Sequence, residues 1–90
     1  MENLKVENMT GSNGNDIPNQ FIIRTDKGTY FQSYQSIIAF KANDRSIILD
    51  RDKWDYSKTT GKYRNQFLGE TKKETEAKIK DGTYKLDDLN

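Results

Sequence analysis

Basic and aromatic side chains gather between residues 54 and 73, and they are the residues of this chain best suited to bind a charged partner. Lys58, Lys62 and Arg64 place three positive charges in seven residues with no acid between them. The same segment also contains hydroxyl groups and the backbone N–H donors at the beginning of a helix. Both kinds of group can bind a phosphate or a carboxylate. The alternative is an ordinary helix cap followed by a solvated basic face. The candidate partner-binding residues are Tyr34, Tyr56, Lys58, Lys62, Tyr63, Arg64, Lys72 and Lys73.

The aromatic residues have two competing interpretations. Together with the neighbouring lysines, rings in this region can form a stacking platform that grips single-stranded nucleic acid. However, hydrophobic residues make up only 32% of the chain, so folding needs most of the rings in the core. We therefore expect Phe31, Trp54 and Phe67 to be buried, whereas Tyr34, Tyr56 and Tyr63 fit either the core or the surface, because a tyrosine hydroxyl is readily hydrated.

The residue inventory argues against an enzyme. The chain has no cysteine and no histidine, which removes thiolate zinc sites, cysteine nucleophiles and histidine general bases. Asp50, Asp52 and Asp55 are close in sequence, but alternating cations and the lack of a glycine-centred loop favour a solvated turn over a metal site. The carboxylates of Glu70, Glu74 and Glu76 have no evident partner that would tune a pKa. We expect no catalytic residue, no metal and no cofactor.

The segment from residue 20 to residue 50 predicts an antiparallel β-meander of about four strands. Two β-favouring runs flank Asp26-Lys27-Gly28, whose glycine can take the left-handed conformation that closes a bulged turn. A second hairpin, from 37–42 to 45–50, is indicated by Asn43-Asp44, a pair that tolerates tight turns. Residues 33–36 connect the hairpins. In the first strand, Phe21 and Ile23 share one face and Ile22 takes the other.

Two short helices are expected after the sheet. Ser57, Thr59 and Thr60 offer N-cap oxygens before residues 62–68, and Gly69 is a natural stop. Residues 71–74 form a capping box that opens a second helix through Lys80, closed by residues 81–82. Both helices pack on one face of the sheet through Tyr63, Phe67, Leu68 and Ile79. The tail with Tyr84, Leu86 and Leu89 adds an edge strand or packs as a strap, and the fold class is α+β.

At 90 residues the chain has room for one small domain. Residues 1–19 are rich in Asn and Gly without strand or helix periodicity, which predicts a flexible N-terminal arm, and residues 20–90 form the single α+β domain. No apolar run is long enough to span a membrane, and the first residues lack a signal-peptide pattern. A cytoplasmic protein that does not bind membranes is therefore expected.

Residues 28–90 carry a recognisable series of motifs: Trp54 followed by Tyr56-Ser57-x-Thr59-Thr60, then Lys62-Tyr63-Arg64, then Phe67-Leu68-Gly69, and a terminal Asp88-Leu89-Asn90. In these motifs the chain resembles a family of small uncharacterised proteins encoded by bacteriophages and other mobile elements of Gram-positive bacteria. The resemblance implies a phage context, in which small proteins often bind and block a host machine, including CRISPR nucleases. It assigns no catalytic residue.

The sequence thus leads to a non-catalytic phage-type binding protein that docks on a host protein or ribonucleoprotein and inhibits it. The alternative is a small nucleic-acid-binding protein that uses a basic, aromatic helix face. Residues 51–80 hold nine Lys and Arg against five Asp and Glu, which serves either function equally. A structural subunit of a virion is a third option. The open sheet edges and thin core also favour a homodimer, through edge pairing or burial of tyrosines.

Overall fold

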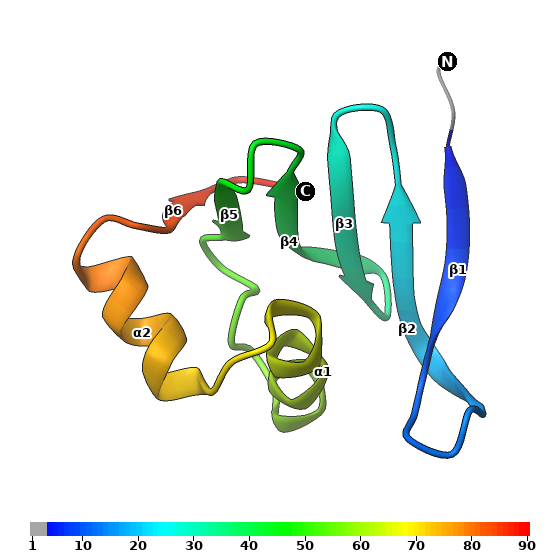
Figure 1. Cartoon of the computed structure of the whole chain (residues 1–90). Coiled ribbons are helices and arrows are strands. Elements are labelled where there is room, and N and C mark those ends of the chain that lie inside the picture. Colours follow the sequence, from blue (N-terminus) through cyan, green and yellow to red (C-terminus); the bar gives the residue numbers. More distant parts are fainter. Residues whose placement is uncertain (1–3) are drawn as a thin grey trace.

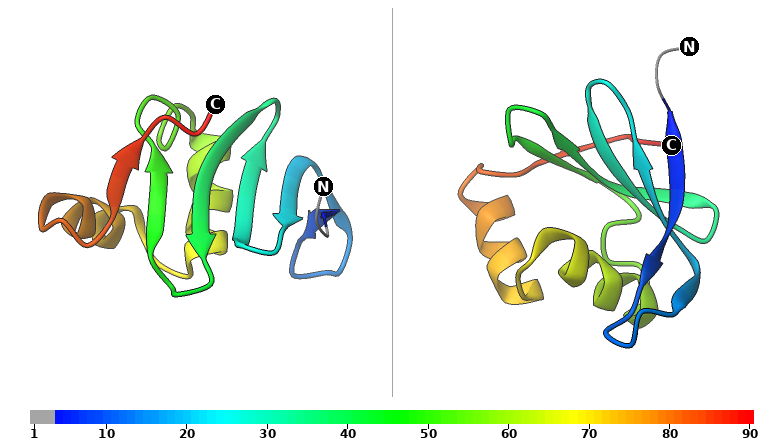
Figure 2. Two further views of the ribbon diagram at one scale, coloured as in Figure 1. Left: turned by 90° about the horizontal axis from the view of Figure 1, so that it is seen from above. Right: turned by 45° about the vertical axis from the view of Figure 1, so that its right-hand side comes forward.

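The computed structural model describes residues 4–90 and shows an α+β fold with a single sheet. The strands are β1 (Lys5–Thr10), β2 (Asp16–Arg24), β3 (Gly28–Ser33), β4 (Ser36–Ala42), β5 (Ile47–Asp50) and β6 (Lys85–Asp87), arranged in the order of the chain (Figure 1). The helices α1 (Lys58–Leu68) and α2 (Lys72–Lys80) lie between β5 and β6 in sequence. Both helices are on the same side of the sheet, so its other face has no covering element (Figure 2).

The predicted meander is confirmed in β2 to β5, but the sheet has six strands instead of about four. Every neighbouring pair from β1 to β5 is antiparallel, whereas β6 is parallel to β5. Between the two strands of that parallel pair the chain passes through both helices, the usual way to join parallel strands. The tail therefore supplies an edge strand, which was one of the two outcomes expected for it.

The N-terminal segment differs from the flexible arm that its composition predicts. Residues 5–10 form β1, which pairs with β2 from Lys5 opposite Arg24 to Thr10 opposite Asp16. The Asn- and Gly-rich stretch is the loop of this hairpin, where Gly14 has a φ of 82°. β1 has no clear periodicity because it is an edge strand with little burial, and Met9 is its one buried residue. Residues 1–3 of the predicted arm lie outside the described residues.

Glycine is required at the start of β3, although for a different reason than predicted. Gly28 has a φ of 155° and does not close the turn in a left-handed conformation. A Cβ at this position would be 2.4 Å from the carbonyl oxygen of Lys41 on β4. The turn itself is held by Thr25, whose hydroxyl accepts bonds from the backbone N–H groups of Lys27 and Gly28. Close packing of β3 against β4 therefore excludes a side chain here.

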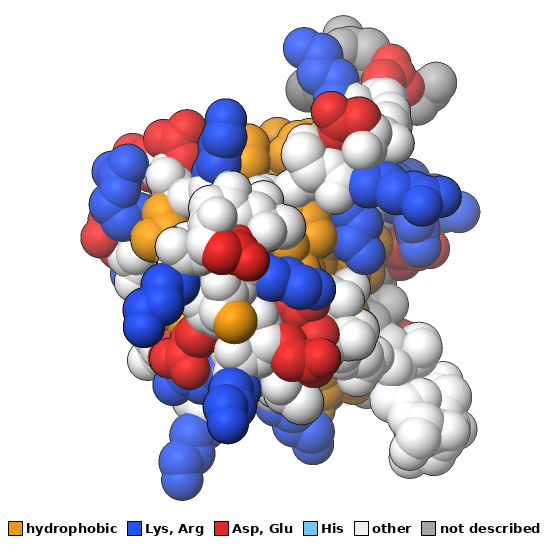
Figure 3. Space-filling view, turned by 60° about the vertical axis from the view of Figure 1, so that its left-hand side comes forward, with side chains coloured by type: hydrophobic (Ala, Val, Ile, Leu, Met, Phe, Trp, Pro, Cys, Tyr) orange, Lys and Arg blue, Asp and Glu red, His pale blue; other side chains and the backbone are white. Residues whose placement is uncertain are grey.

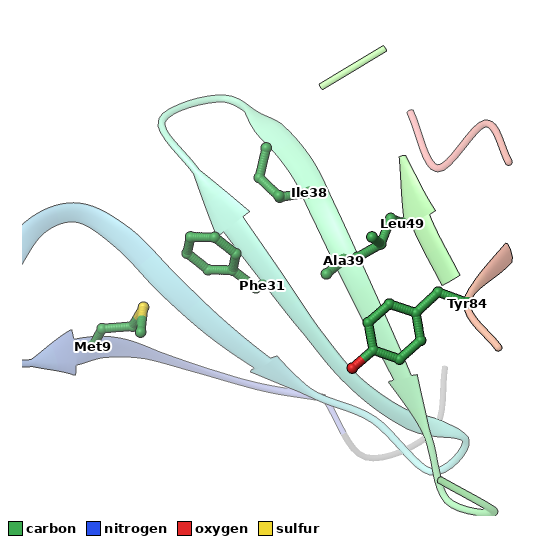
Figure 4. Close-up of a cluster of buried hydrophobic side chains, with 6 residues drawn as sticks. All are labelled: Met9, Phe31, Ile38, Ala39, Leu49 and Tyr84. Atoms are coloured by element: carbon green, nitrogen blue, oxygen red, sulfur yellow. The ribbon is translucent and has the colours of Figure 1, made fainter. Parts of the chain in front are cut away.

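The core lies on the helix-bearing side of the sheet, and Figure 4 shows its buried side chains. Its buried side chains are Met9, Phe31, Ile38, Ala39, Leu49 and Tyr84. Tyr63, Phe67, Leu68 and Ile79 of the helices pack against this cluster as predicted, together with Trp54. The ring centroids of Phe31 and Phe67 are 5.7 Å apart. The expectation that Phe31 is buried is confirmed, and Trp54 and Phe67 are half-buried against it.

The predicted bounds of α2 and the predicted end of α1 are confirmed, whereas α1 begins at Lys58, four residues before the predicted stretch 62–68. Ser57 is the N-cap of α1, and Gly69, with a φ of 71°, ends it in the left-handed conformation. Thr71 and Glu74 form the capping box of α2. The second hairpin turns through residues 43–46, where Arg45 takes a φ of 75°.

Candidate basic hollow at the start of helix α1

The first turn of α1 presents positive charge by two independent routes. Ser57 accepts a bond from the N–H of Thr60 at 3.1 Å, which caps one backbone donor. The first turn holds no acidic residue to offset the positive end of the helix dipole. The exposed side chain of Lys58 adds a full charge at the same place.

Arg64 forms the base of this region and is not a surface residue. Its side chain is 1% exposed. Nη1 donates to the Trp54 carbonyl at 2.7 Å and to Asp55 Oδ1 at 3.1 Å, while Nη2 donates to Asn65 Oδ1 at 3.0 Å. The guanidinium also lies 5.1 Å from the centroid of the Trp54 ring. Arg64 therefore lies in the interior and not at the surface expected for a partner anchor: Nη1 joins α1 to the segment before it, and Nε is buried without a hydrogen-bond partner among residues 4–90.

Asp55 is held between two cations. Its Oδ2 is 2.8 Å from Lys72 Nζ at the start of α2, while Oδ1 faces Arg64. Burial alone would raise the pKa of this carboxyl, but the hydrogen bonds and charges of Lys72 and Arg64 outweigh it and lower the pKa. Asp55 is thus ionised at neutral pH and ties the starts of both helices together.

These groups line a shallow hollow of about 570 Å³, which we call the basic hollow. Its lining residues are Asp55, Ser57, Lys58, Gly61, Lys62, Arg64, Asn65 and Lys72. Four cations and one carboxylate give it a net positive charge. Among residues 4–90, Lys58 and Lys62 make no ion pair with a carboxylate. The arrangement favours an incoming carboxylate or phosphate at its rim.

The structure brings together only part of the predicted set. Lys58, Lys62 and Lys72 meet in the basic hollow, and Tyr56, which is 44% exposed, is next to it in the chain. Tyr63 instead packs against the core, with the ammonium of Lys62 lying 5.3 Å from its ring centroid.

Two predicted residues lie elsewhere. Lys73 lines a separate small hollow on α2 with Glu76, Ala77 and Lys80. On the α2 side of the molecule, basic and acidic side chains are interspersed (Figure 3). Tyr34 is 44% exposed in the β3–β4 turn. This turn follows Ser33, whose hydroxyl is 2.9 Å from that of Thr60 in the first turn of α1.

The sequence interpretation missed the partners of Glu70 and Glu74. Glu70 Oε1 accepts bonds from Lys78 Nζ at 2.6 Å and from the Tyr84 hydroxyl at 2.8 Å, and Oε2 accepts one from Thr75. Burial would raise the pKa of Glu70, but these three donors lower it. Bonds from the backbone and hydroxyl of Thr71 also lower the pKa of Glu74. Glu70 precedes Thr75 by five residues and Lys78 by eight. This spacing was the available sequence signal that Glu70 contacts α2 across the start of that helix.

The terminal Asp-Leu-Asn motif has a structural role. Asp50 Oδ1 accepts the N–H of Leu89 at 2.8 Å, so a carboxylate considered as a metal ligand binds the tail instead. The amide of Asn90 pairs with both backbone groups of Ile37, at 2.8 and 3.0 Å. Within residues 4–90 no three acidic or histidine side chains converge to form a metal site. No helix in the same range has the length and apolar character needed to cross a membrane.

Comparisons with curated proteins and with solved structures give no match. One family model does match, and it covers residues 4–83, from just before β1 to just before β6. The matched range includes Ser57, Gly61 and Arg64, which line the basic hollow. Because the match extends over most of the chain, the protein belongs to DUF8033, a family of unknown function.

Proposed function

We propose that this protein is a non-catalytic, phage-type binding protein that docks on an acidic surface of a host protein or ribonucleoprotein and inhibits it. A defence nuclease of the CRISPR type is the most specific form of this proposal. The observation that supports it is the basic hollow, where Lys58 and Lys62 are exposed at the positive end of α1. Neither lysine has an ion-pair partner within residues 4–90, so each is available to a carboxylate on the target.

The rim of the hollow provides the other features of a protein interface. Tyr56 is exposed next to the hollow, and tyrosine supplies large contact area at low entropic cost. Arg64 and Asp55 hold the base rigid, so the rim lysines project from a fixed frame. Pre-organisation of this kind reduces the entropy lost on binding.

The proposal is tested by affinity capture from a lysate of Gram-positive bacteria with a charge-reversed variant. We expect the wild-type protein to retain one host protein after nuclease treatment and at raised salt. Lys58→Glu with Lys62→Glu should lose it, because the target's carboxylates would face like charges. The matched control, Lys73→Glu with Lys80→Glu, makes the same change in net charge on α2 and should retain the target.

Equal loss of the target by both double variants would contradict the assignment of the binding site to the basic hollow, because it would show that only net charge matters. The alternative function, nucleic-acid binding through the same lysines, predicts a different result. The retained material would then be nuclease-sensitive, and its binding would fall log-linearly with salt concentration.

A further inference from the structure

The face of the sheet opposite the helices is apolar, and no element within residues 4–90 covers it. Strand register places Ile23 opposite Tyr30 and Tyr30 opposite Phe40, and Phe40 opposite Ile48. Residues that pair across strands share a face, so these four side chains form one continuous row across β2 to β5. Phe21 on β2 and Val6 on β1 extend it. We call this surface the open face.

The side chains of the open face are distinct from the core. Ile23, Tyr30, Phe40 and Ile48 are half-buried, and the core cluster with its packed neighbours draws on the other side of the sheet. Val6 is 57% exposed. The rings of Tyr30 and Phe40 have centroids 4.5 Å apart, so they pack against each other at the centre of the open face. A contiguous apolar surface of this kind marks an interaction site.

Charge and area indicate what covers it. Within the described strands, the open face carries no charged side chain from Val6 to Phe40. On β5, Asp50 alternates onto the face of Ile48, but it is buried and its carboxylate accepts backbone N–H groups, and Lys85 and Asp87 lie at the β6 margin. Two copies of such a face can meet without opposing like charges or burying an unpaired one. Five strands spaced about 4.8 Å apart and about 20 Å long present roughly 480 Å². Two such faces reach about 960 Å², which is below the roughly 1,200 Å² of a standard stable interface and in the range of weak, reversible complexes.

We propose that the open face is a homodimer interface, in which a second copy of this chain packs sheet against sheet in a two-fold arrangement. The two sheets would lie about 10 Å apart with the side chains of Ile23, Tyr30 and Phe40 interdigitated. The basic hollow is on the opposite, helix-bearing side, so a dimer presents two hollows outward. This inference does not depend on the proposed function.

The test is sedimentation velocity over a wide range of protein concentration. The wild-type protein should sediment as a dimer that dissociates on dilution. Ile23→Glu places a charge in the middle of the apolar contact and should raise the dissociation constant about 100-fold or more. Ala77→Glu adds the same charge at an exposed position of α2 and should leave the dimer unchanged.

Folding of each variant is checked by circular dichroism. If Ile23→Glu does not fold, Val6→Glu carries the test, because Val6 is already mostly exposed and its substitution leaves the monomer intact. A monomeric wild type at all concentrations would overturn the proposal. A dimer that persists in the Val6 and Ile23 variants would also overturn it, and would point to pairing through the β1 edge. A monomer whose open face instead captures a different protein would assign the face to that partner.

Discussion

At the scale of single residues, burial of Arg64 determines which side chains of the α1 segment are available to a partner. A guanidinium has five donors in a fixed planar fork, and here four acceptor or ring groups of the chain surround it. Sequence alone places this arginine between exposed lysines, and nothing in its immediate neighbours distinguishes it. The acceptors are nine and ten residues away, at Asp55 and Trp54, and only the turn before α1 brings them close.

Arg64→Ala should therefore destabilise the protein by about 3 kcal/mol, because it leaves buried acceptors unpaired and opens a cavity beside Trp54. Arg64→Lys should restore only part of this loss, since an ammonium cannot reach the Trp54 carbonyl and both side-chain acceptors in one plane. Urea denaturation measures both changes. Lys62→Ala, an exposed neighbour, should change the free energy of unfolding by less than about 0.5 kcal/mol. An Arg64→Ala protein as stable as wild type would contradict this role.

Tyr34 stores backbone strain at an exposed position. Its φ of 57° lies in the left-handed region, where a Cβ is unfavourable, and its N–H donates to the Asn19 carbonyl at 2.7 Å. Tyr34→Gly should stabilise the protein or leave it unchanged, while Tyr34→Val should destabilise it. Both remove the ring, so their difference, about 1–2 kcal/mol, measures the backbone strain. Thermal unfolding of the pair gives this difference, and equal stability would show that the turn relaxes without cost.

At the scale of elements, Glu70 connects three segments. It lies in the short link between α1 and α2, and its carboxylate binds Thr75 and Lys78 of α2 and Tyr84 just before β6. Its side chain is 5% exposed. The position of α2 over the sheet therefore depends on a buried carboxylate remaining ionised.

This dependence predicts sensitivity to acid. The pKa of Glu70 is lowered from its ordinary value of 4.5, so the folded state binds this proton less readily than the unfolded state does. The stabilisation is fully present above pH 4.5 and is lost as the pH falls through the lower folded pKa. Glu70→Gln should cost about 2 kcal/mol at neutral pH and much less in acid, as measured by urea denaturation at both pH values. Glu76→Gln, on the exposed side of α2, should show no such pH dependence.

Elements with local signals were predictable, and those that depend on distant pairing were not. Capping residues such as Ser57, Thr71 and Gly69 act within one turn, so their sequence positions set the helix ends. β1 has no such signal, because its order comes from pairing with β2 and from contacts such as Glu7 with Arg24 at 2.8 Å. A Gly- and Asn-rich loop in a hairpin and a flexible linker have the same composition.

At the scale of the whole molecule, the sequence could indicate the basic hollow but not its shape. Lys58 and Lys62 are one helical turn apart, which places them on one face. Lys72 joins them only because Asp55 draws the start of α2 toward α1. The open face was missed for a different reason. The scarcity of apolar residues suggested that most of the rings are needed in one core, whereas Tyr30 and Phe40 lie on the opposite face of the sheet.

The connection between β5 and β6 has a consequence for biosynthesis. β1 to β5 pair with their neighbours in the order in which they leave the ribosome, but the helices that cover Phe31 and Leu49 begin only at Lys58. Contacts between near neighbours form before those that close a long loop. A nascent chain therefore holds a five-stranded sheet that is apolar on both sides until the last third of the protein has emerged. We therefore expect a fragment that ends before residue 58 to aggregate in solution, because both faces of its sheet are apolar and uncovered.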